Sequence, residues 1–102
     1  MTVVVRRPPP DVVSALQFTA AAAVLGHITE AEAEAWMARS ALPAAVLAVI
    51  ATLPQEMQFA ARLRATGMTE ADRLDPLIGA ALTALDLTEA QRDDLFRLAA
   101  TL

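Results

Sequence analysis

Residues 88–98 read TEAQRDDLFRL, and this stretch carries the pattern that decides the fold. Thr88 stands where a helix N-cap is expected, and Gln91 follows three positions later. Each side chain can then bond the other residue's backbone amide, which is the arrangement called a capping box. Leu95 and Phe96 follow as apolar residues of the helix that this box begins. We predict a helix over residues 89–101.

The same Thr-Glu-Ala chemistry recurs twice earlier, as TEAE at 29–32 and TEAD at 69–72. The first predicts a helix start at residue 30. The second predicts a single helical turn near 70–74, and its box is the weakest because Asp72 is shorter than Glu or Gln. The spacing of the three copies is unequal, so we interpret them as repeated capping and not as a structural repeat.

Other residues typical of helix starts and ends complete the helical pattern. Asp11 fits an N-cap, and Gly26 fits the position just beyond the C-terminus of the helix that follows. Pro43, Pro54 and Pro76 each fit the first helical position, where a missing N–H costs nothing; Asp75 is the natural cap before the last of them. We predict an all-α fold, a compact bundle of about six short helices, over residues 12–25, 30–39, 43–52, 54–65, 76–85 and 89–101.

Helices this short are marginal alone, so tertiary packing must hold them. Helical periodicity between the capped ends predicts a single core. The predicted members are Leu16, Val24, Val46, Ile50, Phe59, Leu63, Ile78, Leu82, Leu85, Leu95 and Phe96. Phe18 is expected there as well.

The first ten residues differ from the rest of the chain. Val3, Val4 and Val5 are β-branched and favour extended backbone, and residues 8–10 are three prolines that remove amide donors. We predict an extended N-terminal arm over residues 1–10 and a single helical domain over 11–102. The valines are candidates for adding a strand to a partner's sheet edge.

Two further arm residues, Arg6 and Arg7, are adjacent cations. They are expected to pair with carboxylates on the surface that receives the arm. We expect the arm to contact another chain and not its own helical body.

Composition removes several classes of function. The 102 residues contain no cysteine, which excludes disulfides, thiolate zinc sites and thiol catalysis. The net charge is -4, and scattered arginines argue against a phosphate-binding surface. The longest apolar run, residues 41–51, is about half of the ~20 residues that a membrane-spanning helix needs. The apolar residues at the start precede the charges, the reverse of a secretory signal. We expect a soluble protein with neither signal peptide nor transmembrane segment.

Catalytic candidates are few. His27 is the only histidine, and we interpret it as a polar loop residue near a helix C-terminus rather than a general base. Glu30 and Glu34 lie one turn apart on one exposed face, and Asp93 and Asp94 point in different directions. Neither pair faces a partner across a cleft, as glycoside hydrolysis requires. We predict no enzyme, no metal and no cofactor.

Trp36 has two interpretations, which the sequence leaves open. Core filling is favoured, because Ala33, Trp36, Met37 and Ser40 share one side of a helix. The alternative is an anchor for a partner, since tryptophan is enriched at binding hot spots.

A set of short elements spreads along residues 17–102. They are Gln17-Phe18, Leu25-Gly26-His27-Ile28-Thr29, Ala41-Leu42-Pro43, Leu53-Pro54, Gln58-Phe59-Ala60, Gly67-Met68-Thr69, Arg73-Leu74-Asp75-Pro76-Leu77 and Asp93-Asp94-Leu95-Phe96-Arg97. In these elements the chain resembles a family of small all-helical proteins encoded near the tail and tail-fibre genes of tailed bacteriophages and prophages. The family usually has an apolar residue at the position of His27 and more often His at the position of Asp75, so no site carries over at either.

The resemblance implies a structural or accessory protein of a phage tail, in the tail tip, baseplate or fibre region. Its expected partners are other phage structural proteins, with self-association left open and neither nucleic acid nor membrane expected. It would then lie in the virion tail, or in the host cytoplasm during assembly. One alternative is a tail-fibre assembly chaperone that is not retained in the virion. A less favoured one is a small DNA-binding regulator, against which the acidic charge counts.

Overall fold

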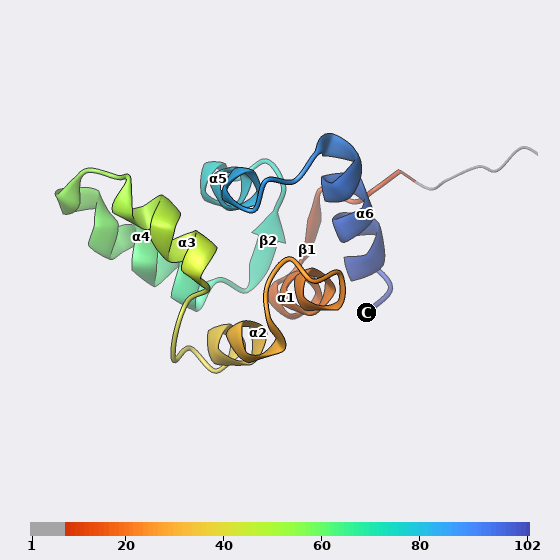
Figure 1. Ribbon diagram of the computed structural model, residues 1–102, viewed down its shortest axis with the longest axis horizontal. Coiled ribbons are helices and arrows are strands. Elements are labelled where there is room, and N and C mark those ends of the chain that lie inside the picture. The colour runs from red at the N-terminus through yellow and green to blue at the C-terminus, as the bar shows by residue number, and fades with distance from the viewer. Residues whose placement is uncertain (1–7) are drawn as a thin grey trace, which may run out of the picture.

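The computed structural model describes residues 8–102, and along them the chain forms six helices and two short strands (Figure 1). The elements in order are β1 Val12–Ser14, α1 Ala15–Val24, α2 Glu30–Met37, α3 Ala44–Ala51, α4 Gln55–Gly67, β2 Glu70–Asp72, α5 Pro76–Ala84 and α6 Glu89–Ala99. The predicted all-α class is confirmed, with a small antiparallel sheet added to it.

Two of the predicted capping boxes are confirmed. In α6 the Thr88 hydroxyl accepts the Gln91 amide at 3.2 Å, and the Gln91 side chain accepts the Thr88 amide at 2.8 Å. Thr29 and Glu32 repeat this arrangement at the start of α2, with both bonds at 3.0 Å. These boxes satisfy amides that a helix start would otherwise leave without partners.

The Glu32 carboxylate also joins two helices. Its second oxygen accepts the amide of Ala44, the first residue of α3, at 2.9 Å. The backbone hydrogen bonds from Thr29 and Ala44 favour the charged form and outweigh partial burial. They therefore lower the pKa of Glu32 below its ordinary value.

The predicted start of the first helix is wrong. Val12, Val13 and Ser14 form β1, and the helix begins three residues later than expected, at Ala15. The N-cap is Ser14 and not Asp11, because Ser14 and Gln17 form a reciprocal capping box. The β-branched pair favours extended backbone, and Val13 is buried in that conformation.

The helical turn predicted near residues 70–74 is also wrong. Residues 70–72 form β2, which pairs antiparallel with β1, Val13 lying opposite Ala71. The Thr69 carbonyl accepts the Ala15 amide at 2.9 Å, and the Asp11 carbonyl accepts the Arg73 amide at 2.7 Å. Pairing with a distant segment thus gives these backbone groups the partners that a helical turn would have supplied.

The remaining starts lie within two residues of the predictions. Asp75 caps α5, with its side chain on the Leu77 amide at 2.8 Å, and Pro76 takes the first helical position. Pro43 and Pro54 instead occupy the N-cap positions of α3 and α4, so these helices begin one residue later than predicted, at Ala44 and Gln55. Gly26 follows α1 with φ +80°, the left-handed conformation that glycine adopts without strain.

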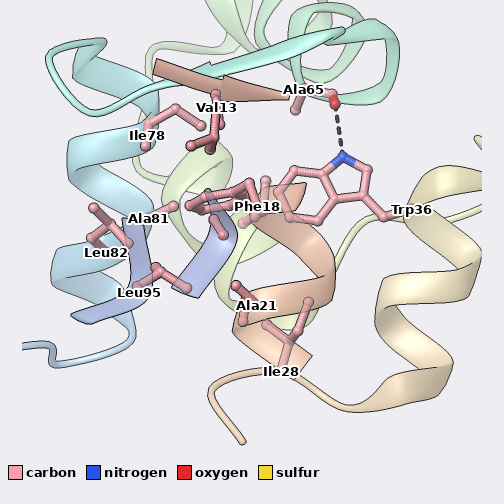
Figure 2. Close-up of a cluster of buried hydrophobic side chains, with 14 of the residues drawn as sticks. Val13, Phe18, Ala21, Ile28, Trp36, Ala65, Ile78, Ala81, Leu82 and Leu95 are labelled. Carbon is pink, nitrogen blue, oxygen red and sulfur yellow. Dashed lines mark hydrogen bonds between the residues drawn. The ribbon is translucent and has the colours of Figure 1, made fainter. Parts of the chain in front are cut away.

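The core lies where α1 packs between α2 and α6 and where α3 meets α5 (Figures 1 and 2). Phe18 contacts Trp36 edge-on, with ring centroids 6.1 Å apart, and lies 5.9 Å from Phe96. The predicted core members found buried are Val46, Ile50, Phe18, Ile78, Leu82, Leu95 and Phe96, and Leu85 is half-buried. Leu16, Val24, Phe59 and Leu63 were predicted as core and are exposed.

Across residues 8–102, no helix combines the length and the apolar character needed to cross a bilayer.

Candidate interaction surfaces

Trp36 lies in the core and connects two parts of the fold. Its side chain is 3% exposed, and its indole Nε1–H donates to the Ala65 carbonyl in the last turn of α4 at 2.8 Å (Figure 2). Core filling is therefore the interpretation that fits. A side chain buried to this degree offers no surface to a partner, so the alternative of a partner anchor is wrong for this structure.

The other predicted partner residues, Val3, Val4, Val5, Arg6 and Arg7, lie outside the described residues. Their role in binding stays a prediction. The chain leaves the arm along Pro8 to Pro10 and enters β1 at Val12.

The polar candidates take structural positions. His27 is half-buried, and its backbone amide donates to the Ala22 carbonyl at 2.8 Å just after α1. Glu30 and Glu34 are exposed on α2. Within residues 8–102, no three histidine, aspartate or glutamate side chains gather as metal ligands.

Asp93 belongs to an ion-pair cluster that fastens α6 to β2. Arg73, which follows β2, pairs with Asp93 and with Glu89 at 2.9 Å. Its guanidinium also lies 5.9 Å from the centre of the Phe96 ring. Desolvation alone lowers the pKa of Arg73, but the hydrogen bonds and charges of Asp93 and Glu89 outweigh it and raise the pKa. The cluster therefore holds the positively charged guanidinium of Arg73 over the ring of Phe96, a core residue.

The first exposed apolar surface is on α1, and we call Leu16, Ala20 and Val24 the α1 stripe. These residues recur every four positions on one side of the helix. Leu16 is 66% exposed and Val24 is 69% exposed, while Ala20 is half-buried. A shallow depression of about 230 Å³ lies beside the stripe, lined also by residues of α2 such as Met37.

Sequence periodicity could not predict which side of α1 is exposed, because the helix carries no charged residue on any side. The sequence of α1 is ALQFTAAAAV. Its core face is the one that carries Phe18, Ala21 and Ala22. A helix that is apolar all round is normally covered on all sides. The missing charges were thus a signal for a further contact surface.

The second exposed surface is on α4, and we call Phe59 and Leu63 the α4 ridge. They are 63% and 57% exposed. The helix buries two alanines instead, Ala61 and Ala65, on the side where the Trp36 indole reaches the α4 backbone. A small residue at 65 allows this close approach, so the large apolar residues lie on the other side.

A groove adjoins the ridge, about a third of a turn round α4 at 3.6 residues per turn. We call it the α4 groove. It has a volume of about 370 Å³ and is bounded by α3, α4 and α5. Its lining is Val49, Leu53, Glu56, Met57, Ala60, Ala61, Arg64, Pro76, Leu77 and Ala80. Because three helices form it, no local sequence pattern would have revealed it.

Comparison with protein-family models, characterised proteins and solved structures gives no match.

Proposed function

We propose that this protein is a structural or accessory component of a bacteriophage tail that acts by binding other virion proteins. The phage context rests on the resemblance described for residues 17–102. The binding role is supported chiefly by one observation, the uncharged α1 stripe with two large aliphatic side chains about two-thirds exposed. The proposal involves neither catalysis nor a cofactor.

The stripe has the properties of a contact surface and not of an incidental exposure. Burying the remainder of Leu16 and Val24 in an interface is worth roughly 1–2 kcal/mol for each side chain. The flanking depression lets a partner side chain enter between α1 and α2. The partner we expect therefore presents an apolar helix face or a similar uncharged patch.

The arm is a second proposed contact, supported by its composition alone. Deleting residues 2–7 keeps the pairing of β1 with β2, so the unfolding temperature of the isolated protein is expected to stay unchanged. Incorporation into the assembly is expected to weaken. A truncated chain that incorporates at full occupancy would show that the arm is incidental.

The function is tested by mass spectrometry of purified tail particles from a host that carries the gene. A virion component is expected at fixed copy number, whereas consistent absence combined with misassembled fibres would indicate the chaperone. Leu16→Asp is expected to reduce incorporation strongly without unfolding the chain, because Leu16 is exposed. Leu74→Asp is the matched control, since Leu74 is also exposed but lies in the loop between β2 and α5 and not on α1.

A further inference from the structure

We propose that copies of this chain bind one another head to tail, with the α4 ridge of one copy docked in the α4 groove of the next. This inference concerns a different helix from the α1 stripe and is independent of the phage context. It rests on three properties of α4: the exposure of the ridge, the size of the groove, and the order of the charges along the helix.

The ridge is a compact apolar projection. Phe59 and Leu63 are one turn apart, so their side chains lie next to each other on the surface of α4. The Arg62 guanidinium lies 5.9 Å from the centre of the Phe59 ring and flanks the ridge with a positive charge. Within residues 8–102, both ridge side chains remain more than half exposed.

The groove has room for this projection. An apolar cavity of about 150 Å³ holds a benzene molecule. The groove, at about 370 Å³, can therefore take a phenyl ring together with the isobutyl group of a leucine. Its walls on α3 and α5 carry no charge, since the sequences of these helices are AAVLAVIA and PLIGAALTA. Its charged residues, Glu56 and Arg64, both come from α4.

The charges on α4 select the direction in which the ridge lies. Glu56 is near the N-terminus of the helix, and Arg62 and Arg64 are in its second half. Consider the ridge helix of the first copy antiparallel to the groove helix of the second. The midpoint between Phe59 and Leu63 of the first copy is placed over Ala60 of the second. At 1.5 Å per residue, Arg62 of the first copy then falls about 5 Å along the axis from Glu56 of the second. Glu56 of the first copy falls about 2 Å along the axis from Arg64 of the second, whose guanidinium already pairs with Asp75 of its own chain at 2.9 Å but whose side chain is 64% exposed. Opposite charges meet at both ends, which sets the register.

A closed two-fold dimer does not satisfy the same contacts. Ridge and groove lie on different sides of one helix, so reciprocal docking about a two-fold axis requires two parallel α4 helices. That pairing brings the two Glu56 carboxylates face to face, and like charges oppose it. The antiparallel arrangement leaves one ridge and one groove unfilled at the ends of each assembly, so further copies can add.

The first experiment measures the mass of the purified full chain by sedimentation at increasing protein concentration. The mean mass of the unchanged chain is expected to pass that of a dimer. Phe59→Asp is expected to weaken association at least about 30-fold, the effect of losing a hot-spot residue. Leu74→Asp, an equally large apolar-to-acidic change at an exposed site off α4, is expected to associate like the unchanged chain.

The second experiment separates head-to-tail from two-fold association. Phe59→Asp keeps an intact groove, and Met57→Asp in the groove wall keeps an intact ridge; both positions are exposed, and circular dichroism checks that both variants fold. Each variant alone is expected to stay monomeric. An equal mixture is expected to form a heterodimer and nothing larger, because only one junction can form.

Three results would overturn the proposal. One is an unchanged chain that stays monomeric at every concentration. Another is an unchanged chain that stops at a dimer, which indicates two-fold pairing. The third is a mixture of the two variants that shows no association. In the first case, a ridge that binds a different protein would assign the surface to that partner.

Discussion

The contact between α1 and α6 and helix α4, which forms a hairpin with α3, bury apolar side chains of different sizes. Where α1 packs against α6, the large side chains Phe18, Leu95 and Phe96 are buried, whereas Leu16 and Val24 lie on the outer side of α1. In the hairpin, α3 buries Val46 and Ile50, but α4 buries only Ala61 and Ala65 and leaves Phe59 outside. Figure 1 shows the reason: α1 lies between other helices, whereas the hairpin extends to one end of the molecule. The neighbours available to a helix, and not its apolar content, decide which side chains are buried.

The largest expected effect tests this contrast directly. Phe96→Ala is expected to lower the free energy of unfolding by about 3–5 kcal/mol, because it leaves a cavity in the core. Phe59→Ala, the same chemical change on α4, is expected to stay within about 0.5 kcal/mol, as for surface positions. Urea denaturation followed by circular dichroism measures both. Similar losses for the two variants would mean that the hairpin packs more closely than described.

The next effect concerns the contact between the two regions. Trp36→Phe removes the Nε1–H donor and leaves the Ala65 carbonyl, in the last turn of α4, without that bond. A lost partner for a buried polar group costs about 1–3 kcal/mol. We expect faster amide exchange in α4 than in the unchanged protein. The amides of α6 serve as the internal control, and an equal increase there would indicate general destabilisation in place of loosened docking.

A smaller effect separates two threonines with the same local sequence. Thr88→Ala removes the N-cap of α6 and is expected to cost about 1 kcal/mol. Thr69→Ala is expected to stay within about 0.5 kcal/mol, because the contact of Thr69 with Ala15 is made by its backbone carbonyl. Thermal unfolding compares the two. An equal loss at both positions would indicate that Thr69 caps a helical turn after all.

The smallest effect is the pH dependence of the link from α2 to α3. The lowered pKa of Glu32 means that the folded state favours the carboxylate. The ionised Glu32 therefore contributes to the free energy of unfolding above pH 4.5, the ordinary pKa of the side chain. This contribution is lost as the pH falls through the lower pKa of the folded state. Glu32→Gln is expected to remove this part of the acid sensitivity of the unfolding temperature. Glu30→Gln removes the same charge from the same turn of α2 and keeps the bond that the Ala44 amide donates to Glu32, so it is the control for the loss of a charge alone.

Local capping chemistry was predictable from sequence because its partners are two or three residues apart. Thr29, Thr88 and Asp75 each begin a helix as predicted. The pairing of Val12–Ser14 with Glu70–Asp72 was not predictable in this way, since it joins segments far apart in the chain. Glu70–Asp72 carries a local helix-start signal that the distant strand overrides, as tertiary contacts commonly do with short elements.

The surfaces were less predictable than the helices. For α1 the periodicity did not distinguish the core face from the outer face, so Leu16 and Val24 were assigned to the wrong side. For α4 the burial of alanines depends on Trp36, which comes from another helix. A helix whose small residues pack inward gives a misleading pattern when only hydrophobicity is considered.

The fluorescence of Trp36 can report on the contact between α4 and the other helices. The chain has one tryptophan and no tyrosine, so its near-ultraviolet-excited emission comes essentially from a single indole. That indole lies against Phe18 on one side and holds the α4 backbone on the other. A red shift of the emission would report the hairpin moving away from the remaining helices. If that shift came before the loss of helical circular dichroism, the two regions would separate before either one unfolds.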